Sequence, residues 1–292
     1  MLRRLIVVNA DDLGLHEAVN EGIIRAHQEG IVTSASLIAC GGAFEDAVRR
    51  CESCPELDLG VHLTLVEEHP LAPIEKIPSL VDQDGFMPRS YMIFARSWLT
   101  NKIREREIRF ELEAQMARVL DSGIRPTHLD SHQHVHCLPG VWKLTLDIAR
   151  KYGVPFIRVP AFDSLWAEAR TPMAPALRAA VNLMAALRRT TDMSPVRCAD
   201  QVSGFAFSGR LTTSRLLAIL DGLRPELTEI MVHPGIPDED LQQRYRHWEF
   251  QWEAEIRALT DPLVVARCRR GDFTLTSFAG MRALYQTMQS GC

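Results

Sequence analysis

The densest group of reactive side chains lies in the stretch from Thr127 to His136, which reads THLDSHQHVH. Four of the ten histidines of the chain fall within nine residues here, beside an acid and a hydroxyl. Neutral imidazole is the commonest protein ligand of zinc-like cations, so this composition predicts a metal site. In an extended strand, Asp130, His132, His134 and His136 would share one face. Not all of them can bind one ion, and the spacing leaves open which are ligands.

Three other segments carry an acid or an imidazole beside an apolar run. Asp11 and Asp12 follow the first run, His62 lies near the end of the third, and His233 directly follows a later one. Structural alternatives exist: a helix cap for the aspartates, a hydrogen-bonded core histidine, and a turn residue before proline. Because four separate runs carry such groups at the same relative place, we favour a shared site. One aspartate and His62 would then bind metal, the other aspartate would act as a base, and His233 as a general acid.

Arg158 lies in a short apolar run that a proline ends. Its guanidinium either pairs with a catalytic carboxylate, contacts substrate or forms an ordinary salt bridge, and the sequence leaves these alternatives open.

The apolar periodicity predicts alternating strands and helices. Strands are expected at Leu5–Val8, Ile31–Ala39, Leu57–Leu65, the histidine-rich stretch, Phe156–Val159, Leu227–Val232 and Phe273–Thr276. Helices are expected at Ala18–His27, Ala43–Arg50, Glu105–Asp121, Val141–Tyr152, Pro172–Arg188, Thr213–Leu223, Asp238–Arg246, Glu249–Leu259 and Phe278–Met288. In the helix Glu105–Asp121 the apolar residues share one face and the charges lie opposite. Val66–Arg89 is expected to be a long loop and Ala199–Gly209 irregular.

This order predicts an α/β fold, a distorted TIM-like barrel of about seven parallel strands with crossover helices. The 292 residues show no composition break, so we expect one barrel domain over residues 1–292. In such a barrel the active site lies at the carboxyl ends of the strands, where the acids and histidines occur.

The bulk composition excludes several functions. The formal net charge is -4 and the basic residues are dispersed, which excludes nucleic-acid binding. No apolar run is long enough for a transmembrane helix. The seven cysteines are odd in number and scattered, which favours a reducing cytoplasm. Glycine-rich phosphate loops and a GxSxG elbow are absent.

Four motifs resemble those of the YdjC/ChbG-like carbohydrate deacetylases and occur in the same order. They are Val8–Gly14 (VNADDLG), Gly60–Leu63 (GVHL), Thr127–His136 and Val232–Gly235 (VHPG). The segments Ile77–Asp82, Gly204–Gly209 and Leu227–Ile230 further resemble the branch associated with hopanoid biosynthesis, HpnK. The histidine-rich motif is more similar to that of the chitooligosaccharide branch.

The resemblance implies a distorted (β/α) barrel related to the polysaccharide deacetylases. It also implies one divalent metal ion held by an aspartate and two histidines. Carried over by motif position, these ligands are Asp12, His62 and His132, with Asp11 as general base and His233 as general acid. Zinc-like ions suit two imidazoles and a carboxylate, whereas the family is commonly described with magnesium, so both metals remain expected.

Four further polar residues are expected to orient the metal ligands or to contact the substrate. They are Asp130, His134, His136 and Arg158.

The implied reaction removes an acetyl group from an N-acetylated amino sugar. The substrate is a free oligosaccharide or a glycolipid such as an N-acetylglucosaminyl hopanoid. A metal-dependent phosphoesterase and a non-catalytic sugar-binding barrel are the alternatives. A glycolipid substrate would imply peripheral membrane contact, with Pro172–Arg188 and Val66–Arg89 forming a lip over the site. Alternatively, the helix Pro172–Arg188 packs in the core or in a homodimer interface.

Overall fold

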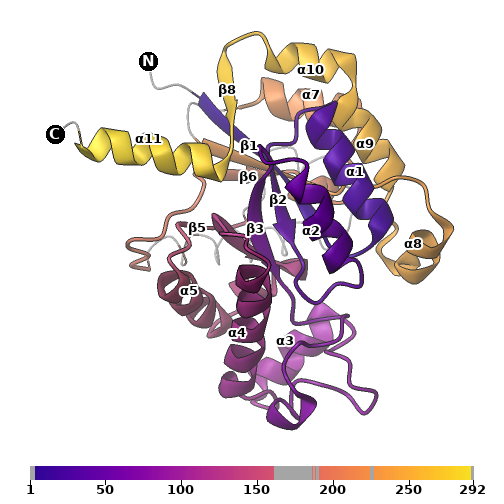
Figure 1. The fold of residues 1–292 in the computed structure, drawn as a ribbon, viewed down its shortest axis with the longest axis vertical. Helices are drawn as coiled ribbons and strands as arrows, with labels where there is room; N and C mark the ends of the chain where they lie inside the picture. The colour runs from indigo at the N-terminus through magenta and orange to yellow at the C-terminus, as the bar shows by residue number, and fades with distance from the viewer. Residues whose placement is uncertain (1–3, 161–185, 187, 189–190, 224–226, 291–292) are drawn as a thin grey trace.

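One parallel sheet with surrounding helices organises the chain (Figure 1). The computed structural model describes residues 1–292 except 1–3, 161–185, 187, 189–190, 224–226 and 291–292. The strands are β1 (Arg4–Leu13), β2 (Ser34–Leu37), β3 (Asp58–Leu63), β4 (His128–Ser131), β5 (Phe156–Ile157), β6 (Gln201–Ser203), β7 (Leu227–Val232) and β8 (Phe273–Thr276). Their order is β5-β4-β3-β2-β1-β7-β6, and β8 pairs with the first half of β1.

The two ends of this strand order approach one another. Phe156 in β5 forms a parallel bridge with Arg197, in the segment that leads into β6. The Ile157 N–H donates to the carbonyl of Arg197 at 2.8 Å. The sheet therefore curls towards closure, and the predicted α/β barrel-like fold of parallel strands is confirmed.

The central strand β1 is buried on both faces, as its continuous apolar sequence predicts. Ile6 and Val8 pack in the large core between sheet and helices. Val7, with the opposite parity, packs with Phe156 and Phe278 in a smaller apolar cluster. The same parity places Asn9 and Asp11 on the face of Val7, so the strand itself directs polar groups to that side.

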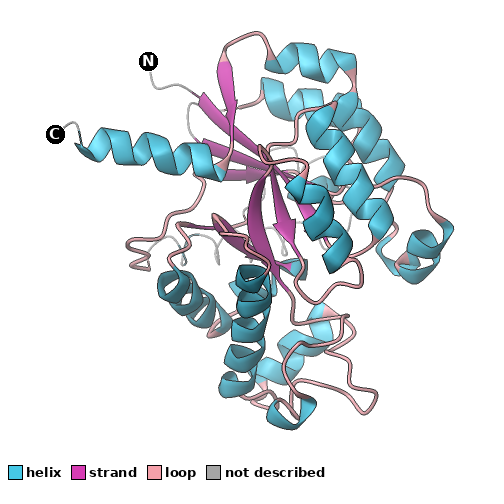
Figure 2. Cartoon of the chain, viewed as in Figure 1, coloured by secondary structure: helices cyan, strands magenta, loops and turns pink. Residues whose placement is uncertain are grey.

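The helices surround the sheet (Figure 2). They are α1 (Glu17–Gln28), α2 (Phe44–Glu52), α3 (Tyr91–Leu99), α4 (Glu105–Asp121), α5 (Val141–Tyr152), α7 (Thr213–Asp221), α8 (Glu239–Arg244), α9 (Trp252–Thr260), α10 (Pro262–Cys268) and α11 (Phe278–Ser290). Helix α1 packs against α2 and α9, and α4 packs against α5. No helix in the described ranges is both long and apolar enough to span a bilayer.

The histidine-rich stretch is not one extended strand, which corrects the prediction that its acid and histidines share a face. Strand β4 ends at Ser131, and a 3₁₀ turn, His132–Cys137, follows. Gln133 and His134 have φ values of 51° and 54°, so the chain turns sharply there. The strand alternation therefore applies only as far as Ser131.

Some boundaries also differ from the prediction. The segment Ala199–Gly209 contains β6, whose backbone pairs in parallel with β7. Helices α3 and α10 were not predicted, because their apolar residues do not form a long periodic pattern. The apolar helix expected at Pro172–Arg188 lies, except for residues 186 and 188, outside the described residues.

Candidate active site

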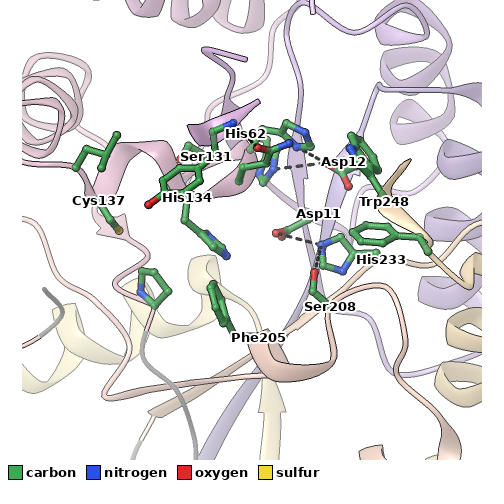
Figure 3. Close-up of a pocket in the computed structure, with 16 residues that line it drawn as sticks. Asp11, Asp12, His62, Ser131, His134, Cys137, Phe205, Ser208, His233 and Trp248 are labelled. Atoms are coloured by element: carbon green, nitrogen blue, oxygen red, sulfur yellow. Dashed lines mark hydrogen bonds and ion pairs between the residues drawn. The ribbon is translucent and has the colours of Figure 1, made fainter. Parts of the chain in front are cut away.

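Asp11 and Asp12 lie inside β1, at its carboxyl end, and not after the strand. Successive residues of a regular strand point to opposite faces. Here the pairing with β2 shifts register between Ala10 and Leu13, and Asp12 has a φ of 67°. This irregularity interrupts the alternation, so both carboxylates line the same cavity (Figure 3).

Three donor atoms converge at the ends of β1, β3 and β4. Oδ1 of Asp12 lies 3.1 Å from Nδ1 of His132 and 3.5 Å from Nε2 of His62. One donor atom from each residue lies within 4.8 Å of the other two, and all three residues are buried. These are the residues that the family resemblance selects as metal ligands. One carboxylate and two imidazoles form a donor set that zinc-like cations accept in catalytic sites.

The second ring nitrogen of each histidine contacts another carboxylate. Nδ1 of His62 lies 2.8 Å from Asp130, and Nε2 of His132 lies 3.1 Å from Glu67. If these nitrogens donate, the lone pairs of the other two nitrogens face Asp12. Carboxylate partners of this kind fix the tautomer and orientation of metal-binding histidines. The residues present therefore fit one divalent cation between Asp12, His62 and His132.

The electrostatic surroundings of the group agree with this fit. Burial lowers the pKa of His132, but hydrogen bonds with Asp12 and Glu67 outweigh it and raise that pKa to about 10. Burial raises the pKa of Asp12, but the hydrogen bond with His132 and the nearby histidine charges hold it well below its usual value. A cation held between them would take the place of the proton on Nδ1 of His132, so its binding would release a proton.

Helix α4 fixes the loop that carries Glu67. Glu107, Glu111 and Gln115 are buried and lie one turn apart on this helix. Gln115 exchanges two hydrogen bonds with the backbone of Thr64, and both glutamates accept hydrogen bonds from backbone N–H groups farther along the loop. The prediction that the charges of this helix lie opposite the buried face is wrong for these glutamates, because the loop backbone supplies their partners.

Arg158 is buried beside Asp11 and binds three carboxylates. Its two terminal nitrogens donate to both oxygens of Asp11 at 2.6 and 2.7 Å. One of them also lies 2.7 Å from Asp130, and Nε donates to Glu229 at 2.7 Å. Arg158 is 2% exposed and does not line the cavity. Of the three alternatives for Arg158, the structure shows the ion pair with Asp11, the acid expected to be the base. The side chain of Arg158 does not face the cavity in which a substrate would bind.

A second group of potential ligands, Asp11, His62 and Asp130, overlaps the first. The guanidinium of Arg158 already bridges its two carboxylates. A cation there would face this buried positive charge, so the group with Asp12 is the better candidate for a metal.

His233 follows β7 and approaches Asp11 from the other side of the cavity. Its Nε2 lies 3.9 Å from Oδ2 of Asp11 and 3.4 Å from the hydroxyl of Ser208. Its backbone N–H donates to the buried Glu255 at 2.5 Å, and its ring packs edge-on against Phe250. The position of this side chain is therefore set by β7 and by the region around α9.

His134 and His136 have different surroundings. His134 lines the cavity and stacks on Phe205, with 4.8 Å between the ring centres. His136 lies behind the wall, where Nδ1 is 2.5 Å from Ser131 and Nε2 is 2.9 Å from the carbonyl of Arg158. Burial lowers the pKa of His136 to about 4. His136 is thus a neutral residue that joins the 3₁₀ turn to the end of β5, whereas His134 is placed to touch a ligand.

The candidate ligands, Asp11 and His233 all open onto one cavity of about 420 Å³, which is within the size range of small-molecule sites. Beyond this polar part its walls are mainly apolar and aromatic. They include Tyr91, Leu138, Pro160, Phe205, Trp248 and Phe250.

A family model described as YdjC-like protein matches residues 5–270. The chain belongs to the YdjC-like family. Curated relatives of this YdjC-like chain include a carbohydrate deacetylase of Geobacillus stearothermophilus, 33% identical, with 90% of this chain and 92% of the relative covered. A chitooligosaccharide deacetylase of Serratia marcescens is 30% identical, with 95% and 99% covered.

Among solved structures, a protein of Enterococcus faecalis described as a cellobiose-phosphate cleavage protein is similar to the YdjC-like chain. It superposes with a TM-score of 0.76 at 28% identity, and covers 96% of this chain and 99% of its own. The similarity therefore extends over nearly the whole fold that positions the candidate site.

Sequence reasoning missed two acids of this YdjC-like site. Glu67 lies on a loop, and only its place shortly after the strand of His62 indicated a site residue. Glu229 gave a clearer signal, since it is a lone acid inside the apolar strand β7. A buried acid in such a run requires a charged partner, and Arg158 supplies it.

Proposed function

We propose that this protein is a metal-dependent hydrolase that removes the acetyl group from an N-acetylated amino sugar. The observation that carries the proposal is the arrangement around Asp12, His62 and His132. Asp11, whose carboxylate is bound by Arg158, lies beside this candidate metal group and lines the same cavity. The imidazole of His233 lines that cavity as well. The names of the curated relatives support the sugar substrate.

A divalent cation held by Asp12, His62 and His132 would polarise the amide carbonyl and lower the pKa of a water molecule. Two imidazoles favour zinc-like ions by donor type, and magnesium is the alternative.

In the proposed reaction Asp11 is the general base. Arg158 binds both of its oxygens, so the carboxylate is held in one orientation. Asp11 takes a proton from the attacking water, whose oxygen forms the new bond to the acetyl carbon.

His233 is the proposed general acid. It lies 3.9 Å from Asp11, so the two groups can serve the entering water and the leaving nitrogen of one amide. As the C–N bond breaks, the proton of His233 passes to nitrogen. Acetate and a free amino sugar are released.

The apolar walls of the cavity indicate which substrates could bind there. Aromatic side chains such as Trp248 and Phe250 suit the apolar faces of sugar rings, and Leu138 and Phe205 extend the apolar surface beyond the polar part of the site. We therefore propose two substrate forms, a free chitooligosaccharide and a glycolipid such as an N-acetylglucosaminyl hopanoid.

The two-metal phosphoesterase alternative needs a second ion near the first. The overlapping group that would hold it is bridged by Arg158, so a single-metal enzyme is favoured. Because the site uses residues of β1, β3, β4 and β7 of one sheet, we propose one deacetylase domain. Among the described residues, Cys40, Cys51, Cys54, Cys137 and Cys268 are free thiols, which supports a reducing compartment such as the cytoplasm.

The test is acetate release from a panel of substrates in the presence of zinc, cobalt, nickel or magnesium. The panel contains N-acetylglucosamine, chitooligosaccharides and an N-acetylglucosaminyl glycolipid, with O-acetylated sugars as controls. We expect release from at least one N-acetylated member. If no member is hydrolysed by protein that carries metal, the proposed function is wrong.

A further inference from the structure

Helix α3 (Tyr91–Leu99) exposes apolar side chains beside the candidate active site. Met92 is 73% exposed, Ile93 52% and Leu99 63%. With 3.6 residues per turn, these three and the exposed Arg96 share one stripe of the helix. The opposite side is anchored by the fully buried Phe94 and by Trp98, whose indole donates to the carbonyl of Pro139 at 2.6 Å. The apolar stripe is therefore presented outward by a fixed helix.

The segment that carries this stripe is basic. From Gly85 to Arg104, both included, the sequence contains four basic residues and no acid. Arg89 is paired with the acids of the preceding turn and Arg104 lies 3.6 Å from Glu107, whereas Arg96 and Lys102 are exposed around and after the helix. A helix with an exposed apolar stripe and basic residues is typical of segments that lie in the interface of an anionic membrane.

The stripe adjoins the cavity that holds the candidate ligands. Tyr91, the first residue of α3, lines that cavity, and its backbone N–H donates to Gln133 at 2.9 Å. Gln133 follows His132 in the 3₁₀ turn, so the exposed helix and a candidate metal ligand are attached to the same short segment.

We propose that α3 docks the protein on the surface of an anionic lipid bilayer. Met92, Ile93 and Leu99 enter the boundary between headgroups and acyl chains, and Arg96 and Lys102 face the lipid phosphates. Charge complementarity favours this occupant over a second copy of the chain, because two copies of the stripe would bring like charges together. Docking brings the mouth of the cavity to the membrane. That consequence for catalysis rests on the proposed function, whereas the docking itself does not.

The test is co-sedimentation of the full-length protein with vesicles of phosphatidylcholine alone and of phosphatidylcholine mixed with phosphatidylglycerol. We expect salt-sensitive binding to the mixed vesicles and much weaker binding to phosphatidylcholine. The triple variant Met92→Ser/Ile93→Ser/Leu99→Ser should bind at least about tenfold more weakly, and Arg96→Glu about fivefold or more. Circular dichroism and thermal unfolding check that the variants fold.

Matched controls lie on or beside α10, at the opposite end of the molecule in Figure 1. Leu263 is 66% exposed there and Arg270 is also exposed. Leu263→Ser and Arg270→Glu therefore make the same kinds of substitution, apolar to serine and basic to acidic, away from α3. Both controls should bind like the wild type.

The proposal is overturned if the wild type does not bind the mixed vesicles, or if the α3 variants bind as well as the controls. A third outcome also overturns it: the wild type does not bind vesicles and is a dimer by light scattering, whereas the triple variant is a monomer. In that case α3 contacts a second copy of the chain. Acetate release from a water-soluble sugar should be unchanged in the triple variant. If the wild type binds vesicles but releases no acetate, the proposed function is contradicted and the membrane-docking proposal still stands.

Discussion

Nε2 of His132 lies 3.1 Å from a carboxylate oxygen of Glu67, which belongs to the loop after β3. Glu67 also accepts hydrogen bonds from Trp248 and contacts His247, so its carboxylate is held from two sides. A metal-binding imidazole held in this way has one tautomer and one orientation. The loop thereby joins the strand of His62 to the ligand that follows β4.

Replacing Glu67 by Gln should weaken metal binding about 10- to 100-fold, because His132 loses the charged partner that orients it. Metal titration by calorimetry measures the affinity. The neighbouring variant Glu68→Gln is the control, since Glu68 binds Tyr245 and Arg244 and does not contact His132. Equal affinities of the two variants would show that Glu67 does not support the ligand.

Asp11→Asn should reduce acetate release by about 10²- to 10⁴-fold, the usual contribution of a general base. Metal content, measured by mass spectrometry, should stay at the wild-type level, because Asp12 provides the carboxylate ligand. Asp12→Asn serves as the comparison and should lose both metal and activity. Wild-type activity in Asp11→Asn would remove Asp11 from the mechanism.

Arg158→Met should destabilise the fold by about 3–5 kcal/mol, because three buried carboxylates lose their shared positive partner. The free energy of unfolding is measured by denaturant titration. Arg267→Met is the control, since Arg267 pairs with Asp221 and Asp272, whose side chains are exposed. If Arg158→Met lowers the free energy of unfolding no more than Arg267→Met does, the three buried carboxylates do not need Arg158 for stability.

Stability should fall as the pH decreases from about 6.5 to 4, in part through His136. The unfolded residue has a pKa near 6.5, whereas burial lowers the folded value to about 4. The unfolded state therefore binds the proton first, and a contribution of about 3 kcal/mol present above pH 6.5 is lost on acidification. The variant His136→Asn should show a shallower dependence of unfolding free energy on pH over this range. Parallel curves for both proteins would contradict the assignment.

Much of the fold follows from local pattern. The helices α4 and α5 and the strands β7 and β8 have the predicted bounds, because their apolar residues follow the period of the element that packs in the core. Because parallel strands bring their carboxyl ends together, Asp12, His62 and His132 converge although they are far apart in sequence.

Other parts of the site depend on backbone conformations that no periodicity encodes. The positive φ of Asp12 aims two successive acids into one cavity, and the turn at Gln133 and His134 separates three histidines that a strand would align. Glu67 reaches His132 only because buried glutamates of α4 fix its loop, and these residues look like ordinary surface charges in the sequence.

The most direct test of the central claim combines metal counting with acetate release. Metal is removed by a chelator and returned stepwise, and activity on an N-acetylated sugar is followed in the wild type and in His62→Ala and His132→Ala. We predict that stripped protein is inactive, that activity rises to a plateau at one ion per chain, and that neither variant recovers. Full activity in stripped protein, or a plateau at two ions per chain, would contradict the account.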